Sequence, residues 1–178
     1  MVGTIKVGKL QAAAGTGNTI AIESGHLIKQ PGSVVQVVTH SVTSGPTTFS
    51  ANSMTNAITI NFTPKFSNSL IKHTFWAKTD LDNTSYTKGQ DCEWLRDSVV
   101  LGQQSWGNYF NRNTNPIADY YPTLTWHGTD TPNTTSQVAY KFNGRNYGGN
   151  GSNHSWVCFS NWNGNGARGN WTIEEIAQ

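Results

Sequence analysis

The stretch SGHLIKQPGSVVQVV, residues 24–38, separates two parts of the chain that differ in character. Before Pro31-Gly32 the sequence is small, polar and broken by glycines. After this pair it is rich in aromatic and β-branched residues, beginning with the alternating run SVVQVVTH. Proline followed by glycine is typical of a tight turn. We therefore predict a joint at this pair, between an N-terminal stem or anchor at residues 1–32 and a head domain at residues 33–178.

The composition indicates an all-β head. Only 12% of the 178 residues are charged, and the chain contains 18 glycines and 7 tryptophans. Average charged content is about 25%, so Asn, Ser, Thr and Gly must form most of the surface. These residues favour turns and strand edges over helix interiors. No window shows a sustained apolar period of 3.6 residues, which an amphipathic helix would require.

Charge and hydropathy narrow the choice of partners. The formal net charge is +2 and the pI is 8.6, and the lysines and arginines are scattered singly. This pattern does not predict binding to nucleic acid. No apolar stretch reaches 18 residues, so we expect no membrane insertion. The N-terminal sequence MVGTIKVGKL has no apolar signal-peptide core, and we expect no Sec-type export.

Strand patterns are dense after Ser33. They comprise SVVQVVTH, AITINFT, LIKHTFWA, the long run DCEWLRDSVVLGQQSWGNYF, TLTWH, SQVAYKF, HSWVCF and WTIEEI. Turn pairs such as Thr63-Pro64, Thr131-Pro132 and Asn143-Gly144 separate them. The stretch GRNYGGNGSNHS, residues 144–155, has the composition of a long loop. Many short strands separated by turns predict an antiparallel β-sandwich, similar to a jelly roll.

The stem has too few apolar residues to fold alone. Its short runs place Ile5 with Val7, and Ile20 with Ile22, on one side of an extended chain. A lone hairpin is marginal in water, so identical chains around a three-fold axis would be needed to bury these residues. We therefore predict a homotrimer, in which His26 could meet its symmetry mates. The alternatives are a flexible tail and a lone turn histidine.

Several motifs resemble bacteriophage tail-fibre and virion-fibre proteins, particularly those of marine and cyanobacterial phages. SGHLIKQPGSVVQVV resembles their stem-to-head joint, and ITINFTPKFSNSLI resembles a corner found early in their heads. DCEWLRDSVVLGQ resembles their strand–Arg-Asp–strand hairpin, with its turn near Arg96-Asp97. DTPNTTSQVAYKF resembles the entry into a late strand, and WTIEEIAQ the closing strand. The motifs occur in the order of the family and together cover most of the chain.

The resemblance implies a viral structural protein with a β-sandwich head, homotrimeric assembly and a place on the virion surface. Assembly would take place in the host cytoplasm, and the partners would be other phage virion proteins. The chain lacks a long N-terminal segment for attachment to a tail tube. A small appendage, a capsid-surface fibre and a C-terminal fragment therefore all remain open.

Candidate catalytic and metal-binding groups are sparse. Asp91 and Glu93 share a strand face at i,i+2, as paired glycosidase carboxylates could, but a solvated strand face explains them equally well. The run DLDN at residues 80–83 offers oxygen ligands for calcium, yet it lacks the further spaced carboxylates of a dedicated loop. The five histidines show no metal-ligand spacing. We expect no catalytic residues, no metal and no cofactor, and hence no enzyme.

The two cysteines, Cys92 and Cys158, lie in strand-like runs. Two are too few for a disulfide scaffold or a structural zinc site. We expect buried thiols that pack as small hydrophobes. A disulfide is the alternative if the protein meets an oxidising medium.

The aromatic residues give the clearest indication of a binding site. Trp76, Trp94, Trp126, Trp156 and Trp171 alternate within strands and are expected to pack in the core. Other aromatics lie in polar, glycine-rich stretches, where a ring can stack on a sugar while amides and guanidinium groups bind its hydroxyls. The predicted ligand-binding residues are Trp106, Tyr109, Asn111, Arg112, Tyr147, Trp162 and Arg168. The alternative is that these aromatics close the core ends or form trimer contacts.

The function predicted from the sequence is a phage virion appendage that displays its head for host attachment. The partner on the host would be a cell-surface glycan or protein. One alternative is a capsid-surface fibre or decoration protein, for which residues 1–32 would be the anchor. Another is a monomeric carbohydrate-binding module.

Overall fold

The structure is a computed structural model that describes residues 30–42, 47–49, 53–81, 89–106, 123–147, 156–159 and 168–178. These residues form ten strands: β1 (Val34–Val42), β2 (Thr47–Phe49), β3 (Thr55–Phe62), β4 (Leu70–Leu81), β5 (Gly89–Arg96), β6 (Val99–Trp106), β7 (Thr123–Asp130), β8 (Val138–Tyr147), β9 (Trp156–Cys158) and β10 (Gly169–Ile176). The described residues contain no helix, and so none that could cross a membrane.

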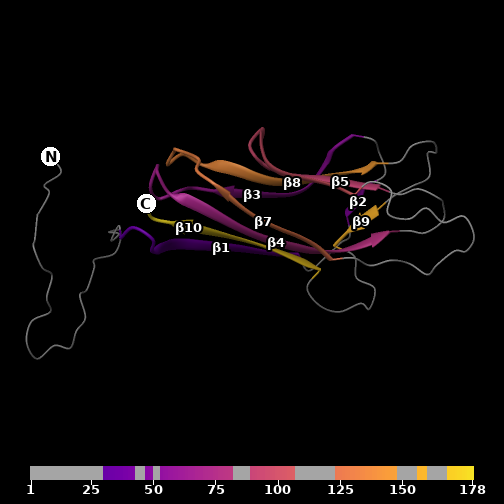
Figure 1. Cartoon of the computed structure of the whole chain (residues 1–178), viewed down its shortest axis with the longest axis horizontal. Coiled ribbons are helices and arrows are strands. Elements are labelled where there is room, and N and C mark those ends of the chain that lie inside the picture. The colour runs from indigo at the N-terminus through magenta and orange to yellow at the C-terminus, as the bar shows by residue number, and fades with distance from the viewer. Residues whose placement is uncertain are drawn as a thin grey trace, which may run out of the picture.

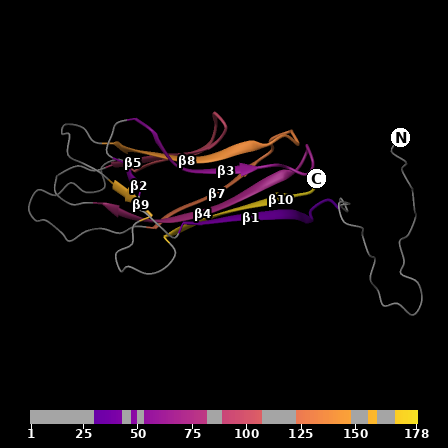
Figure 2. The same cartoon turned by 180° about the vertical axis from the view of Figure 1, so that it is seen from behind.

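The strands form two antiparallel sheets that pack face to face (Figure 1). The larger sheet has the order β1-β10-β4-β9-β2, and β7 also pairs with β4. Because β10 and β7 pair with the same stretch of β4, they lie on its two opposite edges. The smaller sheet has the order β3-β8-β5-β6. The predicted β-sandwich is therefore confirmed, and Figure 2 shows the same two layers from behind.

The pairing is that of a jelly roll. The pairs β5–β6, β4–β7, β3–β8, β2–β9 and β1–β10 nest one inside the next around the turn at Asp97-Ser98. Two further strand pairings, of β10 with β4 and of β8 with β5, join these nested pairs into sheets. The eight longer strands thus make two four-stranded layers, as in other double-sheet jelly rolls. The turn lies one residue beyond the centre predicted from DCEWLRDSVV.

The predicted strands all occur, with three differences. The three-residue strand β2 was missed, because TTF is too short to show a period. Asn143-Gly144 is not a turn but lies inside β8, which continues to Tyr147. Gly144 is part of the sheet there because it pairs with a residue on each side, Thr55 of β3 and Cys92 of β5. The loop expected from residue 144 therefore begins later, and residues 148–155 lie outside the described part of the chain.

Side chains of alternate residues on both sheets form one core. From the larger sheet the core receives Ile71, Phe75, Trp171 and Ile173, and from the smaller sheet Ile58, Ile60, Phe62, Trp94, Tyr140 and Phe142. Aromatic rings interlock at its centre: the ring centroids of Phe75 and Phe142, on opposite sheets, are 4.7 Å apart. Burial of about 25 cal/mol per Å² of apolar surface makes this core the main source of stability.

The predictions for the tryptophans hold in part. Trp94 and Trp171 are fully buried, and Trp126 is half-buried against the core. Trp76 was wrongly assigned to the core. Phe75 points inward, so strand alternation places Trp76 on the outer face of the larger sheet, where it is half-buried. The side chain of Trp156 lies outside the described residues.

The joint at Pro31-Gly32 is a tight turn. Ser33 N donates to the Gln30 carbonyl oxygen at 3.0 Å, and Gly32 has a φ of 84°. Proline at the second position and a positive-φ glycine at the third match a type II turn. Gly32 N donates to Ala177 O and Ala177 N to Ser33 O, at 2.8 and 2.9 Å, so the turn is bound to the end of the chain. The stem residues Ile5, Val7, Ile20, Ile22 and His26 lie outside the described part, and the trimer stays a prediction.

Candidate functional site

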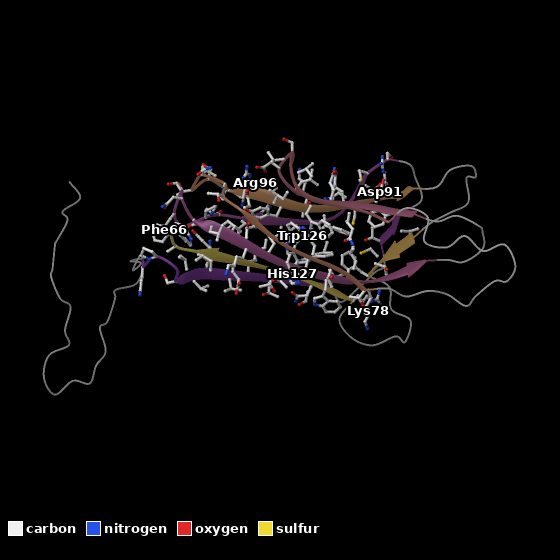
Figure 3. All side chains as sticks on the ribbon, in the orientation of Figure 1. Phe66, Lys78, Asp91, Arg96, Trp126 and His127 are labelled. Carbon is white, nitrogen blue, oxygen red and sulfur yellow. The ribbon has the colours of Figure 1, made fainter. Side chains whose placement is uncertain are left out.

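The two ends of the sandwich differ in what they carry. The joint, the C-terminus, the β3–β4 corner and the β7–β8 connection lie at one end, here called the joint end (Figure 1). At the other end, here called the far end, β1, β4, β6 and β8 finish and β5, β7 and β10 begin. Figure 3 shows Phe66 at the joint end and Lys78 and Asp91 toward the far end.

Three of the predicted ligand-binding positions lie among the described residues, and all three are at the far end. Trp106 ends β6 and Tyr147 ends β8, and these positions pair with Gln90 and Gly89 of the strand between them. Arg168 directly precedes β10. The topology therefore brings positions 106, 147 and 168, which are up to 62 residues apart along the sequence, to one end. The other predicted positions lie outside the described residues: Tyr109, Asn111, Arg112 and Trp162.

Arg168 joins three strands at the far end. Its backbone N donates to Val42 O of β1 and its carbonyl oxygen accepts from Lys78 N of β4, both at 2.9 Å. Its side-chain Nε is buried without a hydrogen-bond partner. The next residue, Gly169, lies against the ring of Phe159, and an added Cβ would come within 2.6 Å of that ring. Hydrogen bonds to β1 and β4 thus fix the position of the Arg168 backbone.

An ion pair lies near the far end of the smaller sheet. Arg145 and Asp91 are opposite each other on β8 and β5, and Nε and Nη2 of Arg145 contact Asp91 Oδ2 at 2.8 and 2.7 Å. Asp91 is 4% exposed, so the expected solvated strand face is wrong for this residue. Its charge is balanced by the arginine, because a buried carboxylate requires a partner. Glu93 instead accepts a hydrogen bond from Asn143 at 3.0 Å.

The hydrogen-bond and ion-pair partners of Asp91 and Glu93 give both carboxylates a structural role. Asn143 links Glu93 to Asn56 of β3, whose Nδ2 donates to Asn143 Oδ1 at 3.0 Å. The two carboxylates therefore belong to cross-strand contacts that hold β3, β8 and β5 in register. In the described part of the chain, no group of three or more His, Cys, Asp or Glu side chains could hold a metal ion. Of the DLDN run, Asp80 and Leu81 continue β4.

At the joint end, a buried carboxylate binds the β3–β4 corner. Glu175 is 0% exposed, and Oε1 accepts hydrogen bonds from the backbone N of Lys65 and Phe66 at 2.8 and 3.0 Å. Ser69 Oγ donates to the same oxygen at 2.6 Å, and Gln36 Nε2 donates to Oε2 at 2.6 Å. The carboxylate thus connects β10, β1 and the corner. The sequence shows only the alternation that puts Glu175 inside and Glu174 outside.

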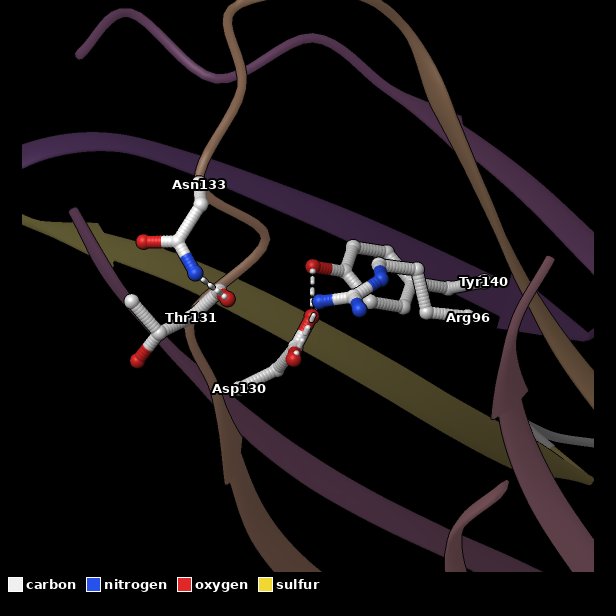
Figure 4. Close-up of polar contacts among 5 residues, drawn as sticks. All are labelled: Arg96, Asp130, Thr131, Asn133 and Tyr140. Carbon is white, nitrogen blue, oxygen red and sulfur yellow. Dashed lines mark hydrogen bonds and ion pairs between the residues drawn. The ribbon is translucent and has the colours of Figure 1, made fainter. Parts of the chain in front are cut away.

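A second buried acid joins the two sheets. Asp130, at the end of β7, accepts from Arg96 Nη1 at 2.6 Å and from Tyr140 OH at 2.9 Å (Figure 4). Burial, followed by the charge of Asp130, raises the pKa of Tyr140, so its hydroxyl stays protonated and donates. Next to it, Asn133 adopts a positive φ of 54° and donates to Thr131 O. Glu175 and Asp130 thus each accept hydrogen bonds from several segments and hold those segments together.

Both cysteines are buried free thiols, as predicted. Burial, with the charge of Asp91 as the second cause, raises the pKa of Cys92 to about 12. Burial also raises the pKa of Cys158. Because the thiolate is the reactive form, neither sulfur is activated as a nucleophile.

No family model matches the chain, and no curated protein sequence matches it significantly. Among solved structures it is similar to the T13 IBDV viral particle, with 10% identity and a TM-score of 0.49 over 89% of this chain and 35% of that one. The infectious bursal disease virus Gx strain has 9% identity and a TM-score of 0.43, over 89% and 42%. Dimeric latent PorU from Porphyromonas gingivalis has 10% identity and a TM-score of 0.46, over 88% and 14%. These likenesses span less than half of the longer chains and do not bear on function.

Proposed function

We propose that the chain is a virion structural protein of the phage-fibre kind, whose head attaches the particle to the host surface. The observation that carries this proposal is the polarity of the head. The Pro31-Gly32 turn, where we predict that the stem joins, lies at one end of the sandwich, and the described positions predicted to bind ligand lie at the other. A stem that holds the head at the joint end leaves the far end pointing away from the particle.

The jelly roll suits this role physically. Its nested strand pairs make a rigid scaffold, and each of the eight longer strands has one terminus at the far end. Binding residues on many proteins lie in connections positioned by such a scaffold. Polar connections that carry Trp, Tyr, Asn and Arg can bind a glycan or a protein surface. The strand ladders fix the relative positions of the strand ends from which such connections would leave.

Trimeric assembly would make weak contacts durable. Three copies on one stem present three identical far ends to the same cell surface. Once one site has bound, the others bind at an effective concentration of about millimolar for short linkers. Linked sites can exceed the affinity of one site by about 10²–10⁴-fold. Attachment would then need no tight individual site and no chemistry.

The test of this function uses purified particles and the purified full chain. Antibodies against the chain should label particles of the virus that encodes it, on the tail if it is a tail fibre and on the capsid if it is a decoration protein. Excess free chain should reduce adsorption of those particles to host cells. Trp106→Ala and Trp162→Ala should reverse this inhibition, whereas Val99→Ala, on an exposed valine, should not. Unlabelled particles would contradict the proposal.

A further inference from the structure

Neither the fold nor the proposed function explains why one core position holds a histidine. His73 is the fourth residue of β4 and is 2% exposed, facing the smaller sheet with the apolar residues of its strand. Neither Nδ1 nor Nε2 has a hydrogen-bond partner. A buried neutral imidazole normally satisfies both nitrogens, since one donates and the other accepts. A leucine or phenylalanine would fill this place without that cost.

Aromatic rings enclose the imidazole. Tyr140 of the smaller sheet meets it edge-on with centroids 4.6 Å apart, and Trp126 and Trp171 lie at 5.4 and 5.9 Å. Directly opposite His73 in the ladders are Ile173 on one side and Gly128 on the other. The glycine leaves room for the Trp126 ring, which an added Cβ would approach to 2.2 Å. Three aromatic rings and two ladder neighbours therefore surround the imidazole, which is 2% exposed.

The charged groups near the enclosure are already engaged. Asp130 of β7 is bound by Arg96 of β5 and by the hydroxyl of Tyr140 of β8. Neither Trp171 nor Ile173 of β10 titrates. An imidazolium at position 73 would carry two donors and would have no free acceptor beside it. Its attraction to Asp130 would be offset by the arginine that already neutralises that acid.

We propose that His73 makes the packing of the two sheets acid-sensitive, because the sandwich closes only around the neutral imidazole. This inference does not depend on the proposed function. Burial is the main influence on His73 and lowers its pKa from 6.5 to about 4, while the charge of Asp130 acts in the opposite direction. The unfolded chain therefore binds a proton at a higher pH than the folded head does. Stability from this residue is complete above pH 6.5 and is lost as the pH falls toward 4.

The test measures unfolding of the full chain by denaturant at fixed protein concentration, from pH 7.5 to pH 4. The folding equilibrium constant of the wild type should fall by about 100-fold more than that of His73→Phe, as the shift from 6.5 to about 4 requires. Phenylalanine keeps an aromatic ring and cannot take a proton. The control His127→Gln changes an exposed histidine on the same sheet and should follow the wild type. Parallel curves for wild type and His73→Phe would overturn the proposal.

A second measurement covers the case in which His73→Phe does not fold. The carbon-bound ring protons of His73 in the wild-type chain can be titrated by nuclear magnetic resonance. We expect the His73 ring to stay unprotonated in the folded head at pH 5.5, and to take up a proton only near pH 4 or when the head unfolds. Titration of His73 near pH 6.5 within a fully folded head would overturn the proposal independently.

Discussion

At the residue scale, the fold depends on buried polar groups that each have an identified neighbour. Glu175 accepts hydrogen bonds from one corner and from β1, and Asp130 connects an arginine and a tyrosine from the opposite sheet. Breaking such an arrangement costs more than the arrangement gains, because the remaining partners stay buried and unsatisfied. These acids therefore favour the native arrangement of the strands over others. His73, in contrast, is buried without a hydrogen-bond partner.

Glu175→Gln should destabilise the head by about 2–4 kcal/mol, because the amide nitrogen would face backbone N–H groups that need an acceptor. Glu174→Gln is the matched control, since the neighbouring residue lies on the outer face and should change stability by less than about 0.5 kcal/mol. Denaturant unfolding at neutral pH measures both. Equal effects of the two substitutions would contradict the role given to Glu175.

Gly128→Ala should strain the contact of Trp126 with the core. The added Cβ would lie 2.2 Å from Cζ2 of that ring, which stacks on Trp94 with centroids 4.8 Å apart and planes at 11°. Such overpacking costs about 1–3 kcal/mol, and moving the ring should change the near-ultraviolet circular dichroism of the stacked pair. Thr129→Ala, on the exposed side of the same strand, should change neither. An unaltered spectrum for Gly128→Ala would mean that the ring is free to move.

At the element scale, the strands follow from alternation and their order follows from nesting around one turn. Runs such as AITINFT and TLTWH show which residues face inward, so most strands could be predicted. Strand β2 could not, because three residues carry no period. Gly144 was misread because Asn-Gly commonly marks a turn, whereas here both neighbouring strands pair with it. Register across a sheet depends on contacts that one segment cannot reveal.

The candidate site was predictable only as a set of residue types. Polar stretches with Trp, Tyr and Arg indicated binding, and the shared far end became visible only once β6 and β8 were placed on either side of β5. The hydrogen-bonding roles of Glu175 and Asp130 could not be recognised from the sequence. Their partners are 106 to 139 positions away for Glu175 and 10 to 34 for Asp130.

The joint turn should tolerate only residues that accept a positive φ. Gly32→Ala should cost about 1–2 kcal/mol, because the open space around Gly32 leaves backbone strain as the only penalty. Gly32→Asn should cost less, since asparagine adopts this conformation more readily. Thermal unfolding of the three proteins gives the order. An alanine variant as stable as the wild type would contradict the turn assigned to Gln30–Ser33.

At the scale of the whole molecule, the head has a fixed polarity. The first and the last described segments of the chain meet at the joint end, where Gly32 and Ala177 are hydrogen-bonded to each other. The C-terminus therefore lies beside the Pro31-Gly32 turn and away from the far end (Figure 1). A partner bound at the joint end would leave the far end exposed to solution. This geometry links the sequence prediction of a stem and head to the proposed attachment.

The most direct test of the account is the mass of the full chain in solution, measured by light scattering over a range of protein concentrations. We predict a trimer, three times the 19.5 kDa of one chain, because the apolar residues of the stem need identical partners. The mass should not depend on dilution through the micromolar range. A particle of 19.5 kDa at every concentration would contradict the trimeric fibre head and would favour a monomeric carbohydrate-binding module.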